Sequence, residues 1–331
     1  MNLEAEEEIL IDVNELAKDY DYYQVSGISI SPDNKKMAFG VDTLSRRIYT
    51  IKVKDLGTGK MYPDKIHGVN SYTTWASDSK TMFYTGKDEQ TLRSDKIFRH
   101  TLGESQDDDT LVYEEKDETF STYVYPSKSR EYIMIGSTST MATEYRFLSS
   151  KTPLESFKVL QKRERGLEYS PSHVGDMFYI STNIDESTNF KLVKTPITLT
   201  EKSNWRDVIP HREDVLIEDT DFFNDFMVIG ERSNGLLKIR IKSWDGKEDY
   251  YLNLSSQFDF ENDTYSASIG YNPNFQTNFL RYSYTSLTTP YSVIDYNLIT
   301  KDEEVQKQQE VLGGSFNSKN YTSERVFATA H

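Results

Sequence analysis

The stretch KKMAFGVDTLSRRIYTIKVKDLGTGK (residues 35–60) contains the pattern that decides the fold. A short apolar run, KKMAFGVD (35–42), is followed after a polar loop by a second run, YTIKVKDL (49–56). Short runs rich in β-branched and aromatic residues and bounded by turn-forming residues are typical of β-strands. The stretch therefore predicts two short strands joined by a polar loop.

The same pair of runs recurs along the chain at intervals of about 45 residues. The runs equivalent to the first one are KTMFYTGK (80–87), EYIMIGST (131–138), DMFYISTN (176–183), DFMVIGER (225–232) and NFLRYSYT (278–285). We count six units, at residues 28–66, 69–117, 120–166, 167–214, 215–257 and 265–309. Four short antiparallel strands at this period are typical of a β-propeller blade, so the sequence predicts an all-β propeller, with a β-sandwich as the alternative.

The composition agrees with an all-β fold and limits the possible functions. Aromatic residues make up 13% of the chain, and they favour the pleated, half-buried surface of a sheet. The net charge of −15 argues against nucleic acid and anionic membranes as partners. The chain has no cysteine, which excludes a disulfide, a thiolate metal site and a cysteine nucleophile.

The N-terminal sequence bears on where the protein acts. MNLEAEEEIL (1–10) is acidic and lacks the basic-then-apolar order of a signal peptide. No apolar run in the sequence approaches the length of a membrane span. We therefore expect a cytoplasmic protein, or a periplasmic one if an upstream signal peptide has been lost.

Several segments of the chain resemble one family of serine peptidases. They are ILIDVNELA (9–17), YYQVSGISISPDNKKMAFGVDTLSRRIYTIKVKDLGTGK (22–60), FYISTNIDESTNFKLVKTP (178–196), NWRDVIPHREDVLIED (204–219), ERSNGLLKIRI (231–241) and VLGGSFNSKNYTSERVFATA (311–330). They are similar to the N-terminal β-propeller of the prolyl oligopeptidase family, and within that family to the oligopeptidase B (protease II) branch. Because the similarity runs through essentially the whole chain in order, it is more specific than any single short motif.

The resemblance implies a two-domain enzyme of which this chain holds one part. A seven-bladed propeller would cap an α/β-hydrolase domain, and its channel and rim would admit only short peptides. Cleavage after Arg or Lys would be carried out by a Ser, an Asp and a His that all belong to the hydrolase domain, which is absent from this sequence. The implied partners are short basic peptides and that hydrolase domain, with no cofactor and no metal, so we expect the chain to be inactive alone.

The resemblance also divides the chain into three parts. Residues 1–27 are expected to be the remnant of a first blade and its connector, with EILIDV (8–13) as the last strand of that blade. Residues 28–312 are the predicted propeller blades. Residues 313–331 are expected to hold a hinge at Gly313 and Gly314 and a strand, TSERVFATA (322–330), that leads into the hydrolase domain. A six-bladed ring closed by EILIDV is the alternative.

The sequence offers no convincing catalytic or metal site. Gly313-Gly314-Ser315-Phe316 resembles the front half of G-x-S-x-G, but Asn317 replaces the second glycine, and no buried strand or helix is expected around it. The five histidines, His67, His100, His173, His211 and His331, lie in predicted loops or strands or at the chain end, and none suggests a triad with Ser315. The acidic runs at 107–109 and 259–264 lack the alternating ligands of a Ca²⁺ loop.

Charged residues gather in the loops between the second and third strands of each unit, which emerge on one face of a propeller. The candidates for a substrate filter or for contacts with the hydrolase domain are Asp42, Arg46, Arg47, Glu144, Glu231 and Arg232, and the same loops hold Asp185 and Glu186. A carboxylate such as Glu144 would attract a second basic side chain or the amino end of a peptide. The alternative for each residue is a solvated or locally paired loop charge.

Two other functions remain open from the sequence. The chain would also fit a stand-alone propeller that acts as a binding or scaffold module. A glycosidase-like propeller with paired carboxylates is a further alternative. The segment TTWASDSKTMFY (73–84) departs from the sialidase Asp-box, because its Trp precedes the turn and the glycine is missing.

Overall fold

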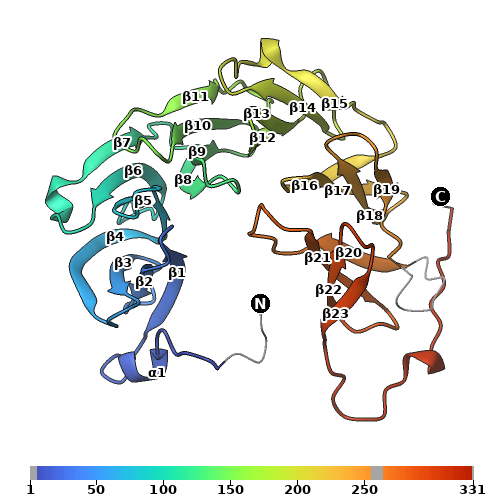
Figure 1. Cartoon of the computed structure of the whole chain (residues 1–331), viewed down its shortest axis with the longest axis horizontal. Helices are drawn as coiled ribbons and strands as arrows, with labels where there is room; N and C mark the ends of the chain where they lie inside the picture. The colour runs from blue at the N-terminus through green and yellow to red at the C-terminus, as the bar shows by residue number, and fades with distance from the viewer. Residues whose placement is uncertain (1–5, 255–263, 330–331) are drawn as a thin grey trace. The chain divides into compact units, whose positions relative to one another are not determined.

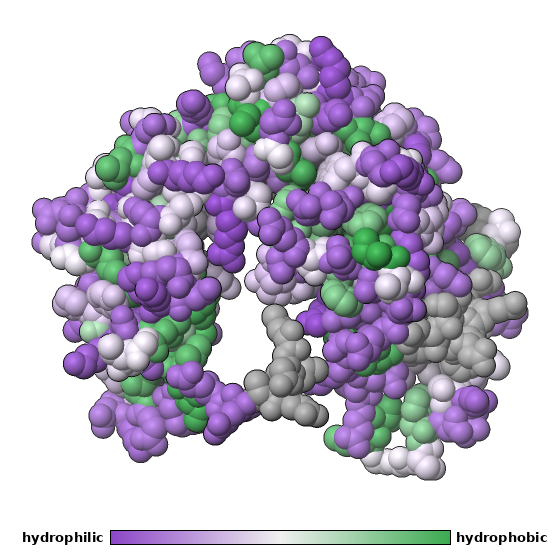
Figure 2. Space-filling model, in the orientation of Figure 1, coloured by the Kyte–Doolittle hydropathy of each residue, from purple (hydrophilic) through white to green (hydrophobic). Residues whose placement is uncertain are grey.

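The computed structural model describes residues 6–254 and 264–329, which form strands β1–β23 and only short helical turns (Figure 1). The chain divides into two compact units, Met1–Glu168 and Tyr169–His331. None of the helices in the described part has the length and apolar character needed to cross a bilayer. The face seen in Figure 2 is mainly hydrophilic, with apolar side chains in scattered patches.

The first unit begins with a one-turn helix and a long antiparallel sheet. Asp12 caps helix α1 (Val13–Leu16) by accepting hydrogen bonds from the backbone N–H groups of Asn14 and Glu15. Seven strands then pair in sequence order: β1 (Gln24–Ile30), β2 (Lys36–Asp42), β3 (Tyr49–Asp55), β4 (Met61–Trp75), β5 (Thr81–Lys87), β6 (Ser94–Thr101) and β7 (Thr110–Glu114). A four-stranded sheet follows, with β8 (Ser121–Pro126), β9 (Tyr132–Thr138), β10 (Thr143–Ser149) and β11 (Lys158–Gln161).

The second unit holds three four-stranded antiparallel sheets, each paired in sequence order. The first contains β12 (Tyr169–Val174), β13 (Met177–Thr182), β14 (Lys191–Pro196) and β15 (Arg206–Ile209). The second contains β16 (Leu216–Phe222), β17 (Phe226–Ser233), β18 (Leu236–Ser243) and β19 (Asp249–Tyr251). The third contains β20 (Tyr265–Ile269), β21 (Phe279–Ser286), β22 (Ser292–Asn297) and β23 (Glu303–Gln308).

The repeat predicted from the sequence is confirmed strand by strand. The apolar runs form the second strand of each repeat, and the following runs form the third strand. In β2 and β5 almost every residue is buried, because both faces of the strand are covered, and such strands read as continuous apolar runs. The first two repeats are joined by β4, whose early residues pair with β3 and whose late residues pair with β5.

Two glycines allow β4 to cross the first two strands of the first unit at short range. A Cβ at Gly40 would lie 2.7 Å from the Cα of Ser71, and one at Gly27 would lie 2.1 Å from the Ser71 carbonyl oxygen. Gly27 also has a φ of +67° at an irregularity in the pairing of β1 with β2. Only glycine fits both positions without displacing the backbone of β4.

Apolar contacts between successive repeats form the core of each unit. In the first unit one such cluster lies between the two repeats of the seven-stranded sheet and contains Ala38, Ile51, Val53, Ile66, Val69, Trp75, Met82 and Tyr84. In the second unit another contains Tyr179, Leu192, Ile209, Ile217, Phe222, Met227 and Ile229. Neighbouring repeats thus bury their apolar faces against each other, as stacked propeller blades do.

The segments at the two ends differ from the sequence-based expectation. Residues 8–13 form no strand; Ile11 packs against Met37, Phe39 and Val41, and Lys54 Nζ donates to the Leu10 carbonyl at 2.6 Å. Residues 322–329 also form no strand within the described part of the chain, and residues 259–263 of the acidic run lie outside it. A lone extended segment needs a partner strand to satisfy its backbone groups, and neither segment pairs with one here.

Candidate functional site

Asp42 organises the loop between β2 and β3. Its carboxylate is buried and accepts hydrogen bonds from the backbone N–H groups of Leu44 at 2.8 Å and Arg47 at 2.7 Å. Arg47 has a φ of +57°, and Lys87 Nζ donates to its carbonyl oxygen at 2.7 Å. The side chains of Arg46 and Arg47 are exposed. Asp42 therefore shapes the loop, and the two arginines remain accessible on its surface.

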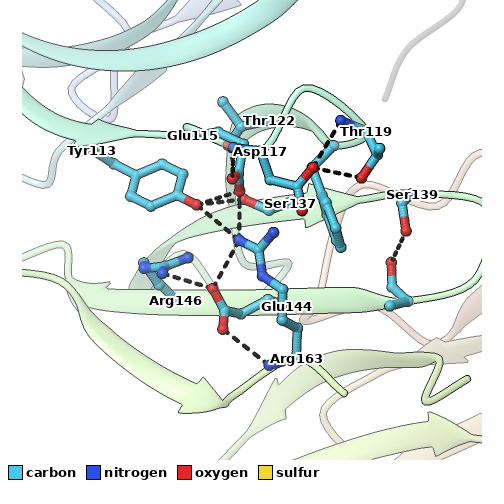
Figure 3. A network of polar contacts seen from close by, with 12 residues as sticks. Tyr113, Glu115, Asp117, Thr119, Thr122, Ser137, Ser139, Glu144, Arg146 and Arg163 are labelled. Carbon is cyan, nitrogen blue, oxygen red and sulfur yellow. Dashed lines mark hydrogen bonds and ion pairs between the residues drawn. The ribbon is translucent and has the colours of Figure 1, made fainter. Parts of the chain in front are cut away.

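Glu144 lies in an extensive polar network of the first unit (Figure 3). It belongs to β10, and only 5% of its surface is exposed. Arg146 Nη2 lies 2.7 Å from Glu144 Oε1, and Arg163 donates to the same carboxylate from its backbone N–H at 3.0 Å and from Nη2 at 3.3 Å. Glu144 is therefore paired with two arginines, one from its own strand and one from the segment after β11.

A second buried carboxylate, Glu115, completes this network from the segment after β7. Its Oε2 accepts hydrogen bonds from Arg163 Nη2 at 2.5 Å and from the Tyr113 hydroxyl at 2.6 Å. Two cation–π contacts fix the guanidinium groups, with Arg146 4.1 Å from the centre of the Tyr113 ring and Arg163 3.9 Å from that of Phe120. Figure 3 shows the side chains of Tyr113, Glu115, Glu144, Arg146 and Arg163 turned toward one another from neighbouring strands and the connections beside them.

The pairing sets the charge of both carboxylates. Burial, the strongest influence, raises the pKa of Glu144, but the Arg163 hydrogen bonds and the charges of Arg146 and Arg163 bring it below its usual range. Burial likewise raises the pKa of Glu115, but the hydrogen bonds from Arg163 and Tyr113 lower it overall. Both groups are therefore ionised at neutral pH, which makes them unsuited to general acid–base catalysis there. Two carboxylates facing two guanidinium groups present little net charge to a ligand.

Glu231 is likewise a buried carboxylate paired with arginines, in the second unit. It belongs to β17 and is 1% exposed. Arg212, between β15 and β16, donates to its two oxygens at 2.6 and 3.2 Å, and the Tyr251 hydroxyl donates at 2.6 Å. Arg240 adds a longer contact at 3.4 Å. Burial raises the pKa of Glu231, but the hydrogen bonds of Arg212 and Tyr251 and the arginine charges lower it overall.

The remaining candidate charges are more accessible. Arg232 is partly exposed and forms a two-pronged ion pair with Glu218, with one contact at 2.9 Å. Asp185 and Glu186 are exposed in the loop between β13 and β14, and Asp185 Oδ2 pairs with Lys191 at 2.9 Å. The structure thus separates the predicted set into buried carboxylates that hold loops and more exposed charges that face solvent.

Sequence reasoning located the carboxylates but missed their partners. Arg163 and Arg212 occupy corresponding positions near the ends of consecutive repeats, and each binds a buried glutamate. This recurrence was visible in the sequence, whereas Glu115 and Tyr113 carry no such signal. Arg93 adds a related contact, because its Nη1 donates to the carbonyl oxygens of Glu115, Asp117 and Phe120 at distances of 3.3, 3.2 and 3.0 Å.

The structure assembles no catalytic group around Ser315 within the part of the chain that it describes. The Ser315 segment, after Gly313 with a φ of +87°, is exposed and lies in neither a strand nor a helix. The turn of a nucleophile elbow needs both elements to fix the serine. Among the described residues, no group of three or more His, Cys, Asp or Glu side chains is arranged to hold a metal ion.

Comparison with known proteins gives a consistent result. The family model for the prolyl oligopeptidase N-terminal β-propeller domain matches residues 1–309. The chain is 39% identical over 326 residues to dipeptidyl aminopeptidase BI of Pseudoxanthomonas mexicana, covering 98% of this chain and 44% of that protein. It is 29% identical over 328 residues to protease 2 of Moraxella lacunata, covering 98% and 46%.

Solved structures show the same similarity. The structure of oligopeptidase B from Leishmania major matches with a TM-score of 0.87 and 28% identity, over 98% of this chain and 46% of that one. Oligopeptidase B from Trypanosoma brucei, in a closed form with covalently bound antipain, matches with a TM-score of 0.84 and 27% identity, over 95% and 44%. The chain spans less than half the length of these relatives. It belongs to the prolyl oligopeptidase family and has the fold of that family's N-terminal β-propeller domain.

Proposed function

We propose that this chain is the substrate-gating propeller of an oligopeptidase B-like serine endopeptidase that cleaves short peptides after Arg or Lys. The observation that carries the proposal is the similarity over 98% of the chain to peptidases of the family, at less than half of their length. In this proposal the catalytic Ser, Asp and His belong to a hydrolase domain outside the sequence. The propeller limits the size of peptides that reach it.

The charged candidate residues fall into two groups by burial, and we propose a different role for each group. Asp42, Glu144 and Glu231 are buried and already paired, so we propose that they hold the loops in shape. Arg46 and Arg47 are exposed, and Arg232 is half-exposed. These three arginines are available to contact acidic groups of the hydrolase domain, and the exposed carboxylates of Asp185 and Glu186 are available to contact a basic peptide. Exposed charges of this kind steer association more than they add to affinity.

A second candidate activity is the release of dipeptides from the amino end of a substrate. It is favoured by the relative with 39% identity, which is named a dipeptidyl aminopeptidase. The two activities give different products from one peptide. A blocked peptide with internal Arg is cut only by an endopeptidase, whereas the same peptide with a free amino end would lose dipeptides in steps.

The test compares this chain alone with the whole polypeptide encoded at its locus, using an Arg-aminomethylcoumarin peptide. We expect no turnover by the chain alone, and turnover by the whole polypeptide that disappears when the serine of its G-x-S-x-G motif is changed to Ala. Turnover by the chain alone would refute the proposal. A whole polypeptide without peptidase activity would favour a stand-alone binding or scaffold module instead. A cytoplasmic location stays a prediction, which fractionation of the source cells would check.

A further inference from the structure

A buried group of charged side chains lies in the first unit, outside the Glu144 network. His100 belongs to β6, Asp64 to β4, and Asp109 directly precedes β7. Their side chains are 1%, 1% and 3% exposed. His100 Nε2 lies 3.0 Å from Asp64 Oδ1, and His100 Nδ1 lies 2.7 Å from Asp109 Oδ1. The proposed peptidase role uses none of these three residues.

Counting protons shows what this arrangement requires. Each ring nitrogen faces a carboxylate oxygen, and an ionised carboxylate can only accept a hydrogen bond. A neutral imidazole donates from one nitrogen, so both contacts are hydrogen bonds only if the ring is doubly protonated or one carboxyl group keeps its proton. Both cases hold the same total number of protons. The group therefore binds one dissociable proton that both contacts depend on.

Few other hydrogen-bond donors lie near the two carboxylates to take the place of that proton. The Gly103 backbone N–H donates to Asp64 Oδ1 at 2.6 Å, and the Tyr84 hydroxyl donates to Asp109 Oδ2 at 2.7 Å. Asp64 Oδ2 is buried without a hydrogen-bond partner among the described residues. Burial, the strongest influence, lowers the pKa of His100, but the hydrogen bonds and charges of Asp109 and Asp64 outweigh it and raise the pKa overall.

The three side chains hold the connection between β6 and β7 in place. Residues 102–109 connect β6 to β7, and both Asp109 and Gly103 belong to this connection. A second attachment comes from Gln106, whose side chain accepts from the backbone N–H of His67 at 2.9 Å and donates to its carbonyl oxygen at 3.0 Å. Both attachments hold the connection against β4. Of the two, only the histidine group depends on a proton.

We propose that Asp64, His100 and Asp109 form a single-proton latch that holds the 102–109 connection on β4 and opens when rising pH removes the proton. Loss of the proton leaves two buried carboxylates facing a ring that can donate to only one of them. An unpaired charge in a dry site is costly, so the connection separates from β4 and admits water. The charged or titratable groups facing His100 are Asp64 from β4, Asp109 from the connection and, through Asp109, Tyr84 from β5. The latch is independent of the proposed function.

The direction of the pH dependence follows from the raised pKa. A histidine whose pKa is higher in the folded state stabilises that state fully below its unfolded pKa of about 6.5. This stabilisation is lost as the pH rises through the folded-state pKa. The latch is therefore closed below about pH 6.5 and opens as the pH rises through the higher folded-state pKa.

The experiment follows the full chain by NMR of its histidine rings and by hydrogen exchange between about pH 6 and 9.5, a range that spans the ordinary histidine pKa and the values above it. We expect the His100 ring to lose its proton at a higher pH than an ordinary histidine and to remain hydrogen-bonded to both carboxylates until it does. After correction for intrinsic exchange rates, protection of the backbone amides at 102–109 should fall by about tenfold at the alkaline end. A His100 ring that is neutral and without a hydrogen bond to either carboxylate at about pH 6.5, or unchanged protection at 102–109, would overturn the proposal.

Two variants separate the latch from general effects of losing a histidine. His100→Gln cannot titrate, so its 102–109 amides should be poorly protected at every pH. His67→Gln is the matched control, because the His67 ring contacts Thr50 Oγ1 at 3.0 Å rather than a carboxylate, and its backbone still binds Gln106. His67→Gln should lose protection of the 102–109 amides with rising pH as the original chain does. If His100→Gln does not fold, the NMR titration of the His100 ring in the unaltered chain still tests the proposal.

Discussion

Individual carboxylates in this propeller take their roles from residues far along the chain. Glu144 and Glu231 are nearly inaccessible and bound by arginines from the connections between repeats. The sequence placed both in loops between second and third strands, which is wrong: Glu144 belongs to β10 and Glu231 to β17, because the strands extend further than the apolar runs indicate. Their pairing was not predictable, because a sequence pattern gives no direction for a side chain 19 residues away from its partner. The exposure of Arg46 and Arg47 was easier to predict from the sequence, since a polar loop exposes most of its long side chains.

Glu144→Gln should reduce the free energy of unfolding by about 2 kcal/mol, because it leaves Arg146 without its carboxylate partner and Arg163 with Glu115 alone. The figure is below that for a fully buried pair, since the arginine side chains are 17% and 26% exposed. The measurement is urea unfolding of the two proteins at neutral pH.

Glu131→Gln is the matched control for that variant. Glu131 pairs with Lys151 at 3.7 Å, with side chains 53% and 68% exposed, so its loss should change little. Because the pKa of Glu144 is lowered on folding, its contribution is complete above about pH 5 and is lost as the pH falls through the folded-state value. A difference between Glu144→Gln and the original chain that stays undiminished at about pH 3 would contradict this account.

Strands in this molecule were predicted well where both faces are buried. The second strands of the repeats, such as β2 and β5, read as apolar runs because almost no residue in them faces water. The sequence did not reveal that β4 is one strand across two repeats, because Gly68 and Asn70 interrupt its pattern. EILIDV has the composition of a strand, but composition cannot supply the neighbouring strand that a ladder needs.

At the level of elements, Gly40→Ala should destabilise the first unit by about 2 kcal/mol through overpacking. The new Cβ would lie 2.7 Å from the Cα of Ser71, and backbone atoms cannot rotate away as a side-chain end can. Thermal and urea unfolding measure the effect. Gly57→Ala is the control, because its Cβ would meet only the Asp55 carboxylate at 3.6 Å. Equal stability of the two variants would show that β4 does not hold this close approach in solution.

For the whole molecule, the net charge of −15 is the feature that acts at long range. It should speed the encounter with cationic peptides and have little effect on neutral ones. We expect the association rate of a fluorescent dibasic peptide to fall several-fold between about 20 and 300 mM salt, as the Debye length shortens. A neutral peptide of the same length is the control. Equal salt dependence of the two peptides would exclude electrostatic steering.

The continuous strand β4 affects how the number of repeats can change during evolution. A gene duplication or deletion that removes one repeat leaves a working protein most readily when both breakpoints fall in loops. Between the first two repeats, any breakpoint would cut through Met61–Trp75 and leave both repeats without a complete strand. Between β11 and β12, a breakpoint would fall in a loop. The first two repeats are therefore expected to be inherited as one piece, and gains or losses to occur farther along the chain.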